Sequence, residues 1–199
     1  MKIQKITKLC KQTKMVAYAT TGAGLWLGNG DCAYLISAFE NLDTDGIALA
    51  LGIGEKDKGK FLFAQMQLET FNLADIDEAK TPCEQIDFTI SHKNALPYRT
   101  EEGVRFIAAD MLEVLKDEIE NIEIYMRRTT DRRAYFVAKI GMYICAFFEP
   151  QRIISADFID KLNAFNNLCR VTYQNDEANL QACAPVADET QMRLEGAEE

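Results

Sequence analysis

The chain has 199 residues, of which 48% are hydrophobic and 10% aromatic, and it carries a net charge of −9. So large an apolar fraction can form a core, which excludes a disordered chain. No apolar run approaches the roughly 20 residues of a membrane-spanning helix, and the lysine-rich start lacks the apolar stretch of a secretory signal. We therefore expect a cytoplasmic protein without membrane contact.

The charge is unevenly distributed along the chain. Residues 1–14 carry five lysines and no acid, which gives +5, whereas residues 175–199 carry seven acids and one arginine, which gives −6. A chain with this overall acidity is not a general coat for nucleic acid. The lysines at the start still allow a local basic surface on an acidic body.

The first 40 residues predict a helix followed by three strands. Apolar residues recur at helical spacing from about Ile3 to Gln12. Asn29-Gly30 is a strong signal for a two-residue hairpin turn. The segments around it predict three antiparallel strands: Met15 to Thr20, Leu25 to Leu27 and Cys32 to Ile36.

Residues 41–81 differ in character from the first 40, and we interpret them as an insertion packed on the sheet. A brief helix is predicted from Ile47 to Ile53, and Lys56 to Lys60 forms a charged loop. The apolar stretch from Phe61 to Phe71 has no clear period, so it predicts no particular element.

Residues 82–150 repeat the order of the first 40. The segment from Ile86 to Ile90 alternates as a strand does, the segment from Ala95 to Tyr98 turns around a proline, and Val104 to Ile107 forms a short strand. Asp110 can cap a helix that continues through Leu115. The stretch from Ile122 to Pro150 then predicts three consecutive antiparallel strands, because Thr129-Thr130-Asp131 and Gly141 interrupt it as turns do.

Helix followed by three strands thus occurs twice, and we predict an α+β fold with a single domain over residues 1–174. Its halves are residues 1–40 and 82–150. Ser155 caps a further helix, over residues 155–170, that we expect to dock on the sheet. Residues 175–199 are rich in acids and predict a flexible tail.

Two stretches in the second half carry a resemblance to a known family. They are VRFIAADMLEVLKDEIENIEIYMRR (residues 104–128) and YFVAKIGMYICAFFEPQRI (residues 135–153). The first is similar to the pattern in which a strand enters a helix before the next strand in DNA sliding clamps, such as the bacterial DNA polymerase III β subunit. The second resembles the strands that end a clamp domain. In outline the chain is also similar to small proteins encoded by prophages and integrative elements of gut bacteria.

The resemblance implies a clamp-like accessory protein of a phage or mobile element. Such a protein is expected to contact duplex DNA or a replication protein and to form a homo-oligomer.

The sequence contains no motif that indicates catalysis. It lacks a Walker loop, a GxGxxG after a strand, a GxSxG and an HExxH. The glycines at 22–24 and 28–30 do not lead into a helix, so we interpret them as hairpin turns rather than phosphate loops. Other polar candidates are interpreted as exposed turn residues: His92 and the pairs Asp43/Asp45 and Asp75/Asp77. We expect no enzyme.

The cysteines likewise indicate no metal site. They are scattered and never form a CxxC pair, and only one histidine accompanies them. We interpret them as reduced, structural thiols and expect neither a metal nor a cofactor. The six are Cys10, Cys32, Cys83, Cys145, Cys169 and Cys183.

Arginines gather at the predicted turn within residues 122–150. Arg127-Arg128 and Arg132-Arg133 flank it, so four guanidinium groups meet at the tip of a hairpin. One interpretation is a solvated turn whose arginines pair with nearby acids. The other is a contact with the DNA backbone, because guanidinium groups suit phosphate oxygens. A second basic face could come from the first helix, through Lys5, Lys8 and Lys11.

Two functions from different classes therefore remain open. The first is a clamp-like accessory protein that contacts the DNA backbone non-specifically. The second is a protein-interaction or assembly module without a nucleic-acid role, in which an exposed sheet edge or the acidic tail binds another protein.

Overall fold

The computed structural model describes residues 2–37, 39, 42–74, 81–87 and 94–183. The chain divides into two compact units, residues 1–152 and residues 153–199, and each is considered by itself. Both helices and strands occur in the first unit, which confirms the predicted α+β class.

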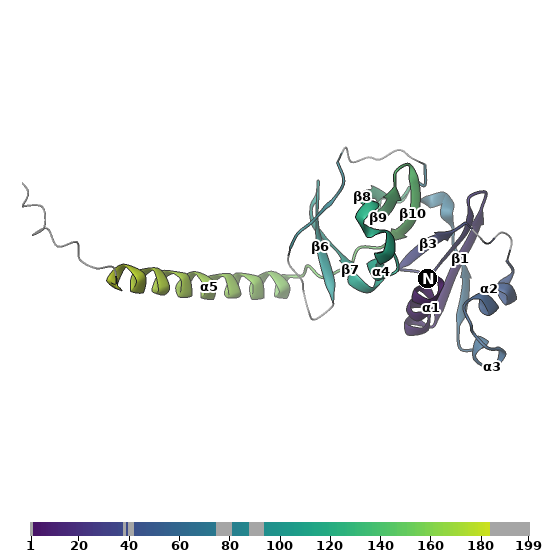
Figure 1. The fold of residues 1–199 in the computed structure, drawn as a ribbon, viewed down its shortest axis with the longest axis horizontal. Coiled ribbons are helices and arrows are strands. Elements are labelled where there is room, and N and C mark those ends of the chain that lie inside the picture. The colour runs from purple at the N-terminus through teal and green to yellow at the C-terminus, as the bar shows by residue number, and fades with distance from the viewer. Residues whose placement is uncertain (1, 38, 40–41, 75–80, 88–93, 184–199) are drawn as a thin grey trace, which may run out of the picture. The chain divides into compact units, whose positions relative to one another are not determined.

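A seven-stranded sheet is the centre of the first unit (Figure 1). Strands β3 and β10 are antiparallel neighbours in the middle of the sheet, and the first group of strands meets the second group there. From one edge to the other the strands are β4 (Leu62–Gln65), β1 (Met15–Thr21), β2 (Gly24–Gly28), β3 (Cys32–Ile36), β10 (Tyr143–Phe148), β9 (Ala134–Ile140) and β8 (Ile122–Arg128).

The two predicted helix-plus-three-strand units join edge to edge in this sheet. The first contributes α1 (Lys2–Thr13) with β1 to β3, and the second contributes α4 (Ala109–Glu113) with β8 to β10. All six strands fall where alternation and turn signals predicted them. The units form one continuous sheet rather than two adjoining ones, because β3 pairs directly with β10. The edge strand β4 comes from the insertion and pairs in parallel with β1.

One face of the sheet is covered by helices. Ile6 and Leu9 of α1 and Leu112 of α4 belong to a buried cluster that includes Leu27 and Phe136 of the strands. From the insertion, α2 (Thr44–Ala50) adds Ile47 and Ala48 to this cluster. The short helix α3 (Glu55–Lys58) has no buried residue, the 3-10 turn η1 (Leu68–Thr70) belongs to the cover of the other face, and a second 3-10 turn, η2 (Lys116–Asn121), follows α4. Helices suit this position because they satisfy most of their own backbone hydrogen bonds and offer only side chains to the sheet.

Two predicted helix boundaries require correction. Ala108, not Asp110, is the residue before the first turn of α4, because α4 continues directly from strand β7 and Ala108 keeps extended dihedral angles. Asp110 lies within that first turn, where a negative charge favours the helix dipole. The predicted charged loop at Lys56–Lys60 begins with the short helix α3.

The other face of the sheet is covered by an irregular segment, residues 66–74, which we call the strap. Its apolar side chains Met66, Leu68, Phe71 and Leu73 pack against a mainly aromatic cluster of the sheet. The ring of Phe71 lies 4.9 Å from that of Tyr135 and 4.6 Å from that of Phe147, centroid to centroid. The insertion thus supplies the second cover of the sheet as well as its edge strand.

From their apolar pattern we expect five residues in one core: Ile124, Val137, Ile144, Phe147 and Phe158. Ile124 belongs to the helix-side cluster, whereas Val137, Ile144 and Phe147 belong to the strap-side cluster. These four are buried, as predicted. The prediction is wrong for Phe158, which is only half-buried and belongs to the second unit. Two cores arise because both faces of the sheet are covered and successive strand residues point to opposite faces.

A separate three-stranded sheet has the order β5 (Glu84–Gln85), β6 (Ala95–Thr100) and β7 (Gly103–Ala108). The predicted turn at Ala95–Tyr98 is wrong, since these residues lie in β6. Pro97 is tolerated there because its carbonyl accepts from Ile86 N on the side of short β5, so its missing N–H also faces that side. Most of the predicted strand Ile86–Ile90 lies outside the described residues.

The second unit contains one long helix, α5 (Ala156–Cys183). The Ser155 hydroxyl accepts from Phe158 N at 3.2 Å, as expected of a helix cap. The helix is longer than predicted and includes residues 175–183 of the expected tail; residues 184–199 lie outside the described part. Docking of residues 155–170 on the sheet stays a prediction. None of the described helices is both long and apolar enough to cross a membrane.

Candidate functional site

The arginines at the β8–β9 turn do not share one environment. Arg127 points to the strap face, and its side chain is fully buried. Its Nη1 donates to the carbonyls of Asn72 at 2.6 Å and Ala74 at 2.7 Å. This burial corrects its expected position at an exposed hairpin tip. The alternation of β8 put Arg127 on the predicted side of the strand, but the strap, not solvent, lies there.

The strap explains why an arginine is buried at this position. An irregular segment leaves its carbonyls without the partners that a helix supplies, and a buried carbonyl without a donor is costly. The guanidinium group offers five donors in a rigid plane and can serve two carbonyls at once. Tyr135 adds to this anchor, because its hydroxyl accepts from Asn72 N at 2.7 Å. Thr130 N also donates to Thr70 O at 3.0 Å.

Two other arginines of the turn are paired with carboxylates. Arg128 forms an ion pair with Glu102, with its Nε 3.0 Å from Oε1. Arg133 lies 2.8 Å from Asp131 and 3.6 Å from Glu149. The hydrogen bond from Arg128 lowers the pKa of the Glu102 carboxyl, which shows how directly the two charges interact. These pairs agree with the first of the two interpretations, a solvated turn whose arginines pair with nearby acids.

Arg132 is the remaining member of the group. It is exposed and has a left-handed backbone, with a φ of 66°. Its carbonyl accepts from Arg128 Nη1 at 2.7 Å, so the main chain of the turn is itself held by an arginine. Among the described residues no carboxylate contact is found for the Arg132 side chain.

No contact between the lysines of α1 and the arginines of the turn is found among the described residues. Lys5 is 3.6 Å from Asp117, whereas Lys8 and Lys11 are exposed. Helix α1 packs on β2 and α4, and the arginines flank the turn between β8 and β9. The two predicted basic groups are therefore not joined by any described interaction.

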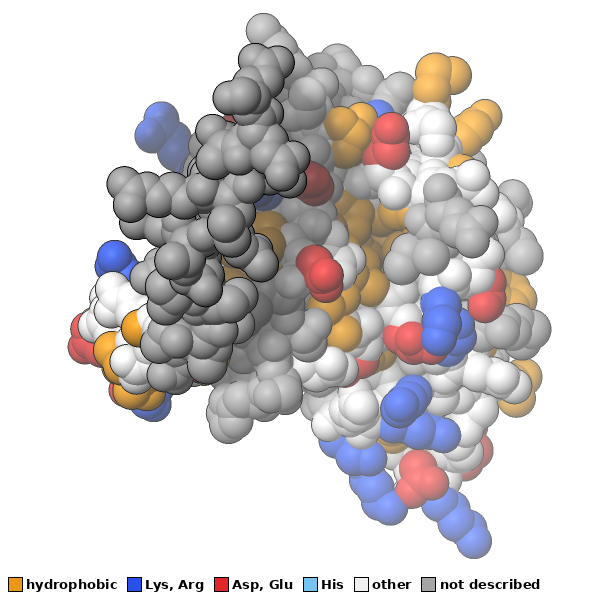
Figure 2. Space-filling view, turned by 60° about the vertical axis from the view of Figure 1, so that its left-hand side comes forward, with side chains coloured by type: hydrophobic (Ala, Val, Ile, Leu, Met, Phe, Trp, Pro, Cys, Tyr) orange, Lys and Arg blue, Asp and Glu red, His pale blue; other side chains and the backbone are white. Residues whose placement is uncertain are grey.

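The structure brings other lysines to α1 instead. Leu62 N donates to Lys14 O at 2.9 Å where β4 begins its pairing with β1, so the chain after α3 lies beside the end of α1. Figure 2 shows Lys and Arg side chains gathered at its lower edge, over α1 and α3. We call the exposed members the lysine patch: Lys8, Lys11, Lys14, Lys56 and Lys60.

Asp57 shows that part of this patch is close together. The hydrogen bond from Lys60, at 2.7 Å, is the main reason that the pKa of the Asp57 carboxyl is lowered, and Lys14 and Lys11 contribute further. Three lysines from two distant segments therefore act on one carboxylate. No local sequence pattern predicts this group of three lysines, because the parallel pairing of β1 with β4 joins segments that are distant in the sequence.

A second surface of unusual composition lies on α5. Seven apolar side chains recur at intervals of one, three or four residues along one broad side of this helix, and we call them the α5 stripe: Phe158, Ile159, Leu162, Phe165, Leu168, Cys169 and Tyr173. Phe158 is half-buried and the others are exposed. Phe165 is 60% and Tyr173 67% exposed. The sequence predicted most of this face but assigned it to the sheet as its docking partner.

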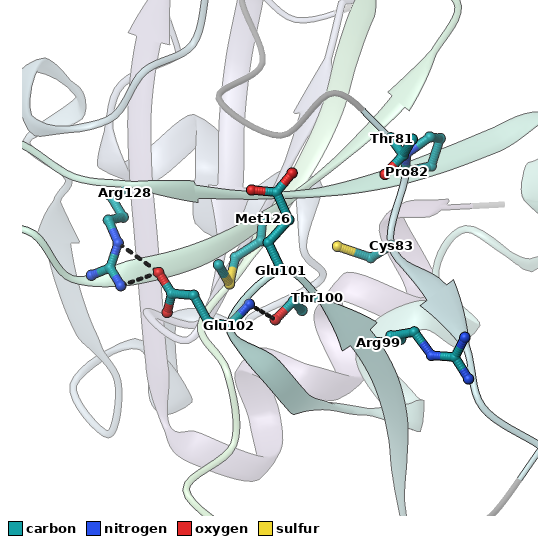
Figure 3. Close-up of a pocket in the computed structure, with 9 residues that line it drawn as sticks. All are labelled: Thr81, Pro82, Cys83, Arg99, Thr100, Glu101, Glu102, Met126 and Arg128. Carbon is teal, nitrogen blue, oxygen red and sulfur yellow. Dashed lines mark hydrogen bonds and ion pairs between the residues drawn. The ribbon is translucent and has the colours of Figure 1, made fainter.

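Two hollows flank the segment at Cys83. The smaller, about 100 Å³, lies between the β6–β7 hairpin and the β8 edge, and Figure 3 shows the Cys83 sulfur directed into it towards Met126. The larger, about 260 Å³, is lined by apolar side chains that include Tyr98 and Leu115. Burial raises the pKa of the Cys83 thiol, so it stays neutral and a poor nucleophile.

The buried thiols of α1 and β3 are equally unreactive. Burial raises the pKa of both Cys10 and Cys32 to about 12. Cys10 Sγ lies 3.2 Å from Gly28 O, and Cys32 Sγ lies 3.1 Å from Asn29 Oδ1. Within the described ranges, no group of three or more His, Cys, Asp or Glu side chains could hold a metal ion.

The remaining polar candidates have structural roles where they are described. Asp43 caps α2 by accepting from Gly46 N at 2.7 Å, and Asp45 forms an ion pair with Lys58. His92 and the pair Asp75/Asp77 lie outside the described residues. The two glycine-containing loops are the β1–β2 and β2–β3 turns, as predicted.

The chain matches no protein-family model, no curated protein and no solved structure. The clamp resemblance and the suggested origin in a mobile element stay predictions. Function is therefore argued from the surfaces above.

Proposed function

We propose that this chain is a non-catalytic protein-interaction module that binds its partner through the α5 stripe. The observation that carries this proposal is the exposure of five large apolar side chains of the stripe, between 41% and 68% each. They are Ile159, Leu162, Phe165, Leu168 and Tyr173.

The physical argument starts from what holds a helix together. Local propensity alone stabilises a helix only marginally, and most helices in proteins owe their stability to packing an apolar face. Single exposed apolar residues are ordinary, but a contiguous apolar surface indicates an interaction site. On α5 the apolar side chains form such a surface, while Asn163, Asn167 and Gln174 occupy the opposite side.

The arrangement of the arginines supports the same choice. Of the four predicted DNA contacts at the turn, Arg127 holds the strap and Arg128 and Arg133 pair with carboxylates. A phosphate group would have to compete with these partners. The turn therefore presents fewer available guanidinium groups to a backbone phosphate than the sequence suggested.

A pair of matched variants tests the proposal. The stripe variant carries Leu162→Glu and Phe165→Glu, and the control carries Asn163→Glu and Asn167→Glu on the opposite side of α5. Proteins captured from cells with the parent chain are identified, purified and bound again by calorimetry. We expect the parent and the control to bind alike and the stripe variant to lose at least about 2 kcal/mol of binding free energy. A partner that binds the stripe variant as well as the parent contradicts the proposal.

A second candidate function rests on the lysine patch. Its five exposed lysines could meet the phosphate backbone of duplex DNA, as a clamp-like accessory protein of a phage or mobile element requires. Salt dependence distinguishes it: each lost phosphate contact flattens the slope of log affinity against log salt by about 0.9. Replacement of Lys11, Lys14 and Lys60 by Gln should flatten the slope, and replacement of Arg128, Arg132 and Arg133 by Gln is the comparison. Absence of DNA binding by the parent at low salt removes this candidate.

A further inference from the structure

We infer that the partner of the α5 stripe is the same helix of a second copy, so that the chain is a homodimer paired through α5. This inference rests on the proposed function and specifies its partner. An isologous pair needs a surface that is complementary to itself. Three properties of α5 meet that requirement: its apolar pattern, its area and its charges.

The apolar pattern is that of a helix that packs along another helix. With Leu162 and Cys169 at equivalent positions seven residues apart, Phe158 and Phe165 occupy the second central position of the same repeat. Ile159, Leu168 and Tyr173 then fall at the flanking positions. Central and flanking apolar residues together form the broad stripe of a packed helix.

The area of the stripe is sufficient for a specific pair. Seven side chains that each lose about 90 Å², roughly half of what a buried aromatic side chain loses, give roughly 600 Å² from one copy. Two copies then bury roughly 1,200 Å², the lower limit for a stable interface. The stripe extends over about four turns of helix, so the contact is continuous.

The charges of α5 lie at the margin and beyond the end of the stripe. The helix carries Lys161 and Arg170 against four acids, which gives a net charge of −2. Lys161 takes the same flanking position as Leu168 one repeat earlier, and Asp176 takes the central position after Cys169. Lys161 is paired within its own helix with Asp157, at 2.7 Å. The central positions from Phe158 to Cys169 are therefore uncharged, although the whole chain is acidic.

Elsewhere in the described residues the exposed large apolar side chains come from separate elements. Leu49 belongs to α2, Leu62 to β4 and Val104 to β7, and Met142 and Tyr143 lie at the β9–β10 turn. No second apolar strip as long as that of α5 is found in this part of the chain. The complement of an apolar strip along a helix is another such strip, and a second copy supplies it at equal concentration.

The experiment measures the molar mass of the full chain by light scattering after size exclusion, over about a hundredfold range of concentration. The parent and the Asn163→Glu/Asn167→Glu control should be dimers that dissociate on dilution with the same Kd. The Leu162→Glu/Phe165→Glu variant should be monomeric. Leu162→Ala/Phe165→Ala, which keeps a high helix propensity, should raise the dimer Kd by about thirtyfold or more. Circular dichroism checks that each variant is folded.

Two results overturn the inference, and they differ from failure of the proposed function. A parent that stays monomeric throughout shows that the stripe does not bind a second copy. A dimer that persists in both stripe variants shows that another surface pairs the copies. In either case a different protein that binds the parent and the control, but not the stripe variants, still supports an interaction module. The proposed function fails if no partner of either kind depends on the stripe.

Discussion

The two faces of the seven-stranded sheet are covered in different ways, and the difference explains where the buried polar groups lie. On one face, α1 and α4 offer apolar side chains to the core. On the other, the strap crosses an aromatic cluster without regular structure of comparable length. An irregular cover must find donors for its own carbonyls, and Arg127 and the Tyr135 hydroxyl of the sheet donate to them.

The helical face shows the same rule at the end of α4. The Tyr34 hydroxyl donates to Met111 O at 2.6 Å. α4 has only five residues, so this carbonyl lies in its last turn, where helices leave carbonyls without an internal partner. Arg127, Tyr135 and Tyr34 therefore bond to backbone groups that the covers of the sheet leave without an internal partner.

The aromatic cluster beneath the strap should give the largest effect. Phe147→Ala removes a ring that packs on both Trp26 and Phe71, at 5.4 Å and 4.6 Å between centroids. We expect a loss of about 3–5 kcal/mol in the free energy of unfolding, from transfer and cavity terms. Chemical denaturation measures it. Phe148→Ala on the helical face should cost a similar amount; a loss below about 1 kcal/mol at Phe147 alone would show that the strap does not pack as described.

Loss of the arginine that anchors the strap should have the second-largest effect on the free energy of unfolding. Arg127→Leu keeps an apolar stem but removes the guanidinium donor of the Asn72 and Ala74 carbonyls. Only Asn72 O keeps another described donor, the Tyr135 hydroxyl at 3.1 Å. We expect a loss of about 2–4 kcal/mol in the free energy of unfolding. In this variant the amide hydrogens of the strap should exchange faster than those of the sheet, and a protease should cleave the strap first.

Arg128→Leu is the matched control for that variant. Its partner, Glu102, lies in a partly exposed ion pair, which contributes at most about 1 kcal/mol. Equal losses for the Arg127 and Arg128 variants would contradict the special role of the strap face.

Removal of one hydroxyl from each face should have a smaller effect. Tyr135→Phe loses the contact with Asn72, and Tyr34→Phe loses the contact with Met111. Each is expected to cost about 1–1.5 kcal/mol in the free energy of unfolding. Hydrogen exchange then separates the faces: Tyr135→Phe should loosen the strap, and Tyr34→Phe should loosen α4. The same pattern of exchange in both variants would break the distinction between the two covers.

The smallest expected effect is on the dependence of the free energy of unfolding on acidic pH. Arg128 lowers the pKa of the Glu102 carboxyl in the folded chain below its ordinary value of 4.5. The pair therefore stabilises the fold above that ordinary pKa, and its contribution disappears as the pH falls through the lowered value. Because the pair is partly exposed, the contribution should be about 0.5 kcal/mol or less. Glu102→Gln should abolish this part of the acid dependence of unfolding; an unchanged acid dependence would show that the pair is not formed in solution.

The local elements could be predicted because their determinants are local. Alternation predicted β8, the Asn29-Gly30 signal placed the turn between β2 and β3, and Ser155 marked the start of α5. Ala95–Tyr98 failed for the opposite reason. Pro97 suggests a turn from its own chemistry, but its neighbours β5 and β7 make it part of a sheet, and only their positions show that its missing N–H is harmless.

By itself, the sequence determined the α+β class, the two helix-plus-three-strand units and the residues that are apolar enough for a core. The tertiary structure decided what each charged residue does. Arg127 and Arg128 are adjacent in sequence, yet one anchors the strap and the other pairs with Glu102, because neighbouring strand residues point to opposite faces. Likewise, the parallel pairing of β4 with β1 brought Lys60 near Lys14. Strand pairing across long sequence separations depends on the packing of the whole chain, and a local pattern does not encode it.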